Sequence, residues 1–226
     1  MDKFRFWKMV SYSRKIITKP FESTLELKDE GGLSHAVKYI SIVTLIKFIF
    51  PILTMFVGVL ITSSVPEVMG VILMVVFLTV IGGALLLIAI ILLEPIKMLV
   101  FSFVFQRLCG LRGSTETFRK LVYSFALFWA PWTLFAGLLS IISYIVPRGD
   151  IDNALQPINL ILLLAKAAIM YYYFSRIGMA VTELPHRKIV FPTVSSIALV
   201  LLLEKVMSFL IESRIMNGIG QIHIYS

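Results

Sequence analysis

The sequence contains few of the groups on which catalysis, metal binding or disulfide bonding usually depend. Its 226 residues include one cysteine, Cys109, so no intramolecular disulfide and no metal site built from cysteines alone can form. It contains no Gly-x-Ser-x-Gly elbow, His-Glu-x-x-His helix, phosphate-binding loop or dinucleotide-binding glycine motif. Its three histidines occupy separate segments, without metal-ligand spacing. We therefore expect no enzymatic activity, no metal and no cofactor.

Charged residues are also scarce. Asp, Glu, Lys and Arg together make up 15% of the chain, whereas hydrophobic residues make up 58%. These proportions exclude an ordinary soluble domain and a disordered chain, and they leave no room for a large soluble domain.

Long apolar runs fill most of the sequence instead. There are five of them, at residues 39–63, 68–93, 121–146, 157–177 and 189–211. Each reaches the roughly 20 residues that a helix needs to cross about 30 Å of hydrocarbon. A soluble protein could not hide five such runs, because its helices need a polar face. The sequence predicts an all-α fold, a membrane bundle of five transmembrane helices preceded by short amphipathic helices.

The positive charge is unevenly distributed along the chain. The net charge is +8, and sixteen of the 21 Lys and Arg residues fall in three segments, 1–38, 96–120 and 176–188. Basic residues collect on the cytoplasmic side of membrane proteins. The pattern therefore predicts a cytoplasmic N-terminus and an extracytoplasmic C-terminus, and it argues against nucleic acid as the partner.

These patterns divide the chain into a cytoplasmic amphipathic segment at 1–38, a five-span domain at 39–212 and a short extracytoplasmic tail at 213–226. Residues 4–17 combine aromatic and basic side chains at helical spacing, which suits a helix lying on anionic lipid. An ordinary basic flank is the alternative. The expected lipid contacts are Trp7, Lys8, Arg14 and Lys15.

Three prolines are expected to kink the spans, namely Pro51, Pro95 and Pro131. A kink at Pro95 would let residues 96–106 lie along the inner interface rather than overshoot the bilayer. Gly82 and Gly83 would let a neighbouring helix approach closely. A homo-oligomer is therefore one of the partners that the sequence allows.

Ionisable residues within the spans are the main candidates for a functional site, because such residues are costly in hydrocarbon. Lys166 and Glu204 lie at similar depths on successive spans, roughly 14 Å and 12 Å from the outer ends. We predict that they form an ion pair, to which Lys205 could also contribute. The pair could clamp two helices together or belong to a pathway for a proton, ion or solute, and the clamp is favoured.

Lys47 lies inside the first span. Its long side chain can extend to the cytoplasmic headgroups, and this is the favoured interpretation. Glu94, near the inner end of the second span, is its best available acidic partner.

Several motifs resemble the Yip family of Rab-interacting membrane proteins, in particular its short prokaryotic members. The matching stretches are 17–22 followed by Gly31-Gly32, the loop 108–114, the basic turn 117–120, Tyr123-Ser124 and Ala130-Pro131. The resemblance covers roughly residues 17–212 and implies a five-span scaffold that organises membranes or membrane-protein partners. The segment 1–38 is much shorter than the cytoplasmic domain of the eukaryotic members, so GTPase binding is not carried over. The alternative function is a small transporter or channel that uses Lys47, Lys166 and Glu204.

Overall fold

The computed structural model describes residues 5–62, 84–111, 114–145 and 152–222. Every regular element in these ranges is an α-helix, which confirms the all-α prediction for this part of the chain. The helices are α1 (Phe6–Thr18), α2 (Pro20–Leu27), α3 (Leu33–Thr62), α5 (Ala84–Leu108), α6 (Thr115–Ile145), α7 (Asp152–Thr182) and α8 (His186–Ile222). Most of the predicted span 68–93 lies outside the described residues, as does the Gly82-Gly83 pair.

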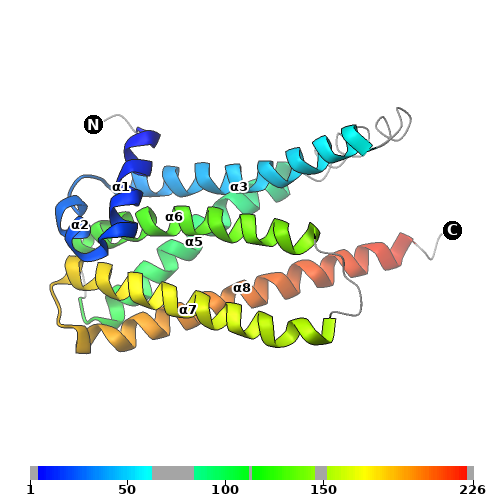
Figure 1. Ribbon diagram of the computed structural model, residues 1–226. Helices are drawn as coiled ribbons and strands as arrows, with labels where there is room; N and C mark the ends of the chain where they lie inside the picture. Colours follow the sequence, from blue (N-terminus) through cyan, green and yellow to red (C-terminus); the bar gives the residue numbers. More distant parts are fainter. Residues whose placement is uncertain (1–4, 63–83, 112–113, 146–151, 223–226) are drawn as a thin grey trace.

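The long helices α3, α5, α6, α7 and α8 lie side by side in one bundle (Figure 1). Helices α1 and α2, which we call the head, lie across one end of it, with α1 against α6 and α2 against α7. We call this the head end of the bundle. Helix α8 begins at the head end and finishes at the opposite end, so its last described residues lie at the other end of the bundle from α1.

The head is fastened to the bundle by polar contacts between segments that are far apart in the sequence. These contacts join Ser13 to Tyr39 (2.8 Å), Ile17 to Tyr173 (2.9 Å), Lys28 to Glu183 (3.2 Å) and Asp29 to Lys120 (2.8 Å). Met9 and Ile16, on the apolar face of α1, are also buried. Polar bonds and apolar burial therefore hold the head in one position.

The described residues at both ends of the connection between α5 and α6 form helix caps. Gly110 adopts the left-handed conformation, with φ of 75°. The Leu111 N–H donates to the carbonyl of Gln106 at 3.2 Å, which is the bond of a Schellman motif. Ser114 Oγ accepts the Thr117 N–H at 3.1 Å and caps α6.

The prolines do not interrupt the helices in which they lie. Helices α3, α5 and α6 stay helical through Pro51, Pro95 and Pro131. In the stretch 96–106, which is predicted to lie along the inner interface, Phe101 is fully buried against α6 and α7, while Ile96 and Phe103 are exposed. One face of this stretch therefore packs inside the bundle, and its placement at an interface stays a prediction.

Large apolar side chains are exposed on all five long helices. Among them are Ile46 and Ile49 on α3, Leu92, Ile96 and Phe103 on α5, Phe135 on α6, Leu163, Leu164 and Ile169 on α7, and Phe191, Val194, Leu202 and Val206 on α8. Polar side chains are buried between the same helices, among them Thr44, Lys97, Ser102, Gln106, Ser124, Thr133, Ser175, Thr193 and Ser196. Apolar side chains therefore lie on the outer surface as well as in the core, whereas the helices of a soluble bundle keep a polar outer face.

One described helix segment, His186–Val206 of α8, is long and apolar enough to cross a bilayer. Taken alone, a single such helix is weak evidence for a membrane protein, because the central helix of a soluble protein can have the same length and composition. However, only 33% of its most apolar stretch is buried within the protein, so this segment is not enclosed as a central helix would be.

Candidate functional site

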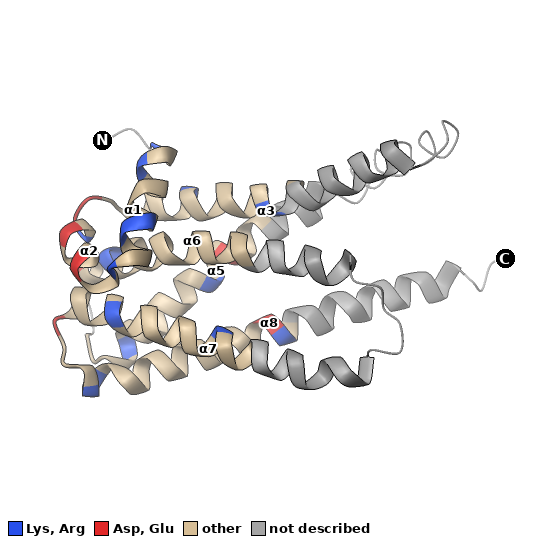
Figure 2. Cartoon of the chain, viewed as in Figure 1, with Lys and Arg blue, Asp and Glu red and all other residues tan. Residues whose placement is uncertain are grey.

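A group of charged side chains lies midway along the bundle, apart from the charges that gather at the head end (Figure 2). Its central residue is Lys97 on α5, whose exposed fraction is 6%. Lys97 Nζ lies 2.6 Å from Oε1 of Glu94, one turn earlier on the same helix. The other Glu94 oxygen accepts a hydrogen bond of 3.0 Å from the indole N–H of Trp129 on α6. Both oxygens of this carboxylate therefore have a donor.

The predicted partners Lys166 and Glu204 are brought together by α7 and α8. Lys166 Nζ lies 2.7 Å from Glu204 Oε2. The second oxygen of Glu204 faces Lys97 at 3.5 Å. A continuous chain of contacts thus runs from Trp129 through Glu94, Lys97 and Glu204 to Lys166, and we call it the charge network.

Lys47 and Lys205 take positions different from those expected of partners in this site. Lys47 on α3 lines the same cavity as Glu94, but no ion pair within 4.0 Å joins these two described residues. The direct cation of Glu94 is Lys97. Lys205 is exposed, and it is Lys97 that forms the second ion pair of Glu204.

Lys97 and Trp129 belong to the site but are not among the residues that the sequence predicts for it. Lys97 falls in the stretch 96–106 that is predicted to lie along the interface, although its spacing of three residues from Glu94 suits an ion pair on one helix face. That spacing was the available signal. No pattern in the neighbouring sequence identifies Trp129 as a site residue, because its partner Glu94 lies 35 positions away in the chain.

The charge network surrounds a small cavity with a volume of about 40 Å³. Lys47, Glu94, Trp129, Trp132, Thr133, Lys166, Met170 and Glu204 line this cavity. It has room for a few water molecules and for nothing larger. Three lysines and two glutamates meet here, with Lys97 counted among them, so basic side chains outnumber acidic ones by one. Such a site can hold helices together, order water or bind a proton.

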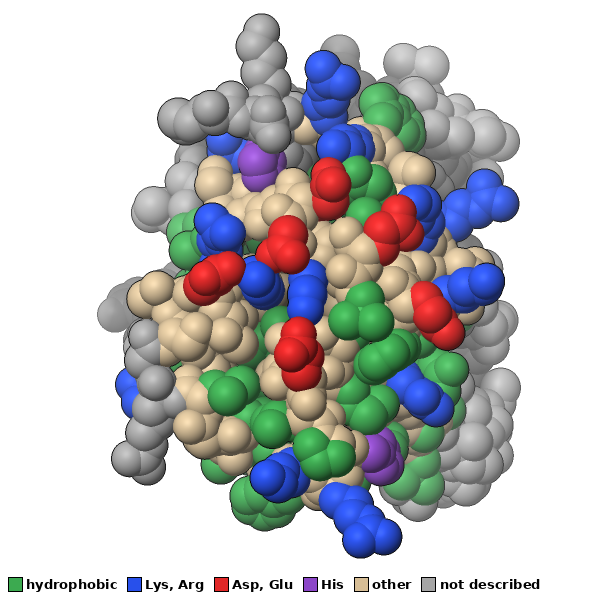
Figure 3. Space-filling view, turned by 90° about the vertical axis from the view of Figure 1, so that its left-hand side faces the viewer, with side chains coloured by type: hydrophobic (Ala, Val, Ile, Leu, Met, Phe, Trp, Pro, Cys, Tyr) green, Lys and Arg blue, Asp and Glu red, His purple; other side chains and the backbone are tan. Residues whose placement is uncertain are grey.

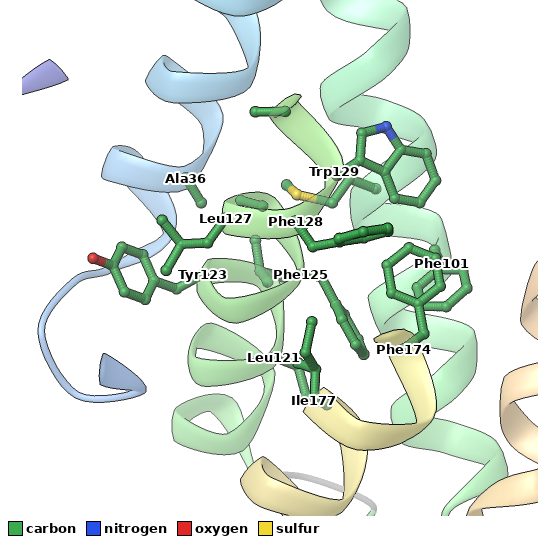
Figure 4. Close-up of a cluster of buried hydrophobic side chains, with 14 of the residues drawn as sticks. Ala36, Phe101, Leu121, Tyr123, Phe125, Leu127, Phe128, Trp129, Phe174 and Ile177 are labelled. Atoms are coloured by element: carbon green, nitrogen blue, oxygen red, sulfur yellow. The ribbon is translucent and has the colours of Figure 1, made fainter. Parts of the chain in front are cut away.

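Aromatic rings fill the bundle between the charge network and the head end. Phe101 on α5, Phe125 on α6 and Phe174 on α7 form the centre of this cluster, with ring centroids 4.5 to 5.2 Å apart (Figure 4). The ring of Trp129 stacks on Phe174 at 5.7 Å, so one residue belongs to both the cluster and the network. We call these four residues the aromatic cluster. It closes the interior on the head side of the charged groups.

Two of the expected lipid-binding cations, Lys8 and Lys15, are already paired within the head. Lys8 lies 3.1 Å from Glu30, and Lys15 lies 2.8 Å from Glu26. Hydrogen bonds from Lys8 and Tyr12 hold the pKa of the Glu30 carboxyl below its ordinary value. Acidic and basic side chains therefore alternate over the head end (Figure 3).

The other two expected lipid contacts, Trp7 and Arg14, are available at the surface. The exposed fraction of Trp7 is 79%, and Arg14 is exposed on the same helix. No carboxylate of the described residues lies within 4.0 Å of Arg14. Of the four expected contacts, these two remain free to meet a partner outside the chain.

Within the described ranges, no group of three His, Cys, Asp or Glu residues is placed to hold a metal ion. No family model, no curated protein and no solved structure matches this chain. The resemblance to the Yip family therefore stays a prediction from the sequence motifs.

Proposed function

We propose that this chain is a membrane protein with five spans and a non-catalytic role as a scaffold for membrane or protein partners. The N-terminus and the head would face the cytoplasm, and the C-terminus would lie on the other side. The basic segments of the sequence support this orientation. The Yip-like motifs support a scaffold role.

The membrane location is supported by the side chains that the bundle presents to its surroundings. Exposed apolar residues occur on all five long helices, for example Leu164 on α7 and Leu202 on α8. In water such a surface would favour aggregation, whereas in lipid it is the natural outer surface of a helix bundle. The buried charges follow the same logic, since ionisable groups inside a membrane face the bundle interior.

The scaffold role rests chiefly on the filled interior around the charge network. The aromatic cluster closes the head side, and the cavity beside Lys166 and Glu204 has a volume of only about 40 Å³. A transporter of solutes needs a larger water-filled site. The close contacts of Glu94 and Glu204 with lysines suit a clamp between helices better than a binding site for a substrate.

A second candidate, a pathway for protons or small ions, is favoured by one specific observation. The ionisable groups come from α3, α5, α7 and α8 and meet at one cavity. A clamp between two helices would need only Lys166 and Glu204. The additional presence of Lys47 and Lys97 gives the site the composition of a proton relay.

A flux assay separates the two functions. The wild-type chain, the double variant Lys166→Leu/Glu204→Leu and the control Lys205→Leu would be reconstituted in liposomes that contain a pH-sensitive dye. The scaffold proposal expects the same proton and ion leakage for all three proteoliposomes. Conduction by the wild type and by Lys205→Leu, but not by the double variant, would replace the scaffold by the pathway.

The topology needs its own test. In a Cys109→Ala background, Lys19→Cys and Ser226→Cys would be labelled with a membrane-impermeant maleimide in intact cells and in inverted vesicles. We expect Lys19→Cys to react only in inverted vesicles and Ser226→Cys only in intact cells. Reaction of both from the same side would rule out an odd number of spans.

A further inference from the structure

An apolar groove of about 270 Å³ lies between the head and the bundle. Val10 and Ile17 of α1, Val43 of α3, and Pro131 and Leu134 of α6 line it. Its surface is almost entirely apolar although it borders the charged head. The groove therefore suits an occupant that is itself apolar over most of its length.

One cation stands at this groove without an acidic partner. Arg14 lines the groove from α1 and is exposed. Lys8 and Lys15 on the same helix are neutralised by Glu30 and Glu26, whereas no described carboxylate lies within 4.0 Å of Arg14. A guanidinium pairs well with phosphate through two parallel hydrogen bonds.

We propose that this groove holds an acyl chain of one anionic phospholipid, whose phosphate is bound by Arg14. The inference rests on the proposed membrane location. With the head at the cytoplasmic surface, Arg14 lies at the depth of the headgroups, and the line of contact between α3 and α6 leads from there toward the hydrocarbon. The lipid would thereby fill the space left between the head and the bundle.

Native mass spectrometry of the full-length protein in detergent tests this site. The protein would be titrated with phosphatidylglycerol, with phosphatidylcholine of the same acyl chains, and with inorganic phosphate. We expect one tightly bound phosphatidylglycerol, weaker binding of phosphatidylcholine and no binding of phosphate. Binding of phosphate alone would show an anion site without an acyl-chain site and would overturn the proposal.

Two variants separate the headgroup contact from the groove. Arg14→Gln should weaken the binding of phosphatidylglycerol about fivefold and leave that of phosphatidylcholine unchanged, because one cation near anionic lipid contributes about 1 kcal/mol. Arg187→Gln is the matched control, since Arg187 is exposed on α8 and does not line the groove. Leu134→Trp should fill the groove and weaken the binding of both lipids.

The proposal fails if Arg14→Gln and Arg187→Gln weaken binding equally, because the lipid would then respond to net charge alone. It also fails if the purified chain is a dimer that Leu134→Trp dissociates, because a second copy would then occupy the groove. Circular dichroism of each variant verifies that it is folded. Extraction of the wild type from membranes by alkaline carbonate would contradict the membrane location itself, whereas a carbonate-resistant chain without selective lipid binding would contradict only the lipid site.

Discussion

Lys97 on α5 and Glu204 on α8 approach to 3.5 Å, although each has a closer partner on the other side. Lys97 lies 2.6 Å from Glu94, and Glu204 lies 2.7 Å from Lys166. The longer contact therefore joins two separate ion pairs into one network across α5, α7 and α8. Charges coupled in this way should respond to substitution as a unit.

Lys97→Met should destabilise the protein more than any other single substitution in the network. It removes the cation between Glu94 and Glu204 and leaves buried negative charge without its partner, which typically costs about 3 kcal/mol. Thermal unfolding in detergent would measure the loss. Adding Glu94→Gln should restore part of it, while Lys205→Met, at an exposed neighbouring site, should change stability by less than about 0.5 kcal/mol. Equal losses for Lys97→Met and Lys205→Met would show that the network does not stabilise the fold.

Gly178→Ala should separate α7 from α5. A Cβ atom at this position would overlap the ring of Phe105, and a methyl group forced into a packed core costs about 1–3 kcal/mol. Phe105→Leu removes part of the ring, so the double variant should be more stable than the sum of the single losses implies. Four unfolding measurements complete this cycle, and strictly additive losses would contradict the close helix contact.

Gly110→Ala should weaken the C-terminal cap of α5. The φ angle of 75° lies in the left-handed region, where a Cβ atom costs roughly 1–2 kcal/mol, although no atom lies within 4 Å of it. Gly32→Ala is the control, because its Cβ would meet only the side chain of Arg119 at 3.6 Å. Unfolding in detergent should show a loss for the first variant alone. The same stability for both would mean that the backbone at Gly110 is not held in this conformation.

The Cys109 thiol should react slowly at neutral pH. Burial raises the pKa of this thiol from 9.0 to about 11, so the neutral form is favoured. At pH 7.5 the fraction of reactive thiolate is therefore about a hundredfold smaller than for a thiol with a pKa of 9.0. The rate of maleimide labelling should rise about tenfold per pH unit until the pH approaches this pKa. A Cys109→Ala/Thr115→Cys chain provides an exposed thiol for comparison. Equal rates at pH 7.5 would show that Cys109 is not shielded.

The Lys166–Glu204 pair could be predicted from the sequence because both residues lie inside apolar runs at similar depths. Helix rise alone was enough to match them. The start of α2 at Pro20 and the cap of α6 at Ser114 are similarly local features of the structure, since each depends on residues within one turn of the helix. Features determined by residue spacing within one or two helices can therefore be predicted from the sequence.

Features determined by packing between distant helices could not be predicted from the sequence. The role of Lys97 depends on how α5 meets α8, and no pattern within residues 96–106 specifies that contact. The acidic partners of Lys8 and Lys15 lie 22 and 11 positions further along the chain, in a segment whose position follows from the fold of the head. The sequence interpretation assigned these lysines to lipid for that reason.

The hydrogen bond from Tyr173 to the carbonyl of Ile17 has a consequence for biosynthesis. The two residues are 156 positions apart, so this bond can form only after α7 has been made, whereas the contacts of α1 with α3 and α6 can form earlier. The bond between Tyr173 and Ile17 is therefore among the last to fasten α1. A nascent chain arrested before α7 would lack this bond and the contacts of α2 with α7, and a protease should cleave its head faster than that of the completed chain.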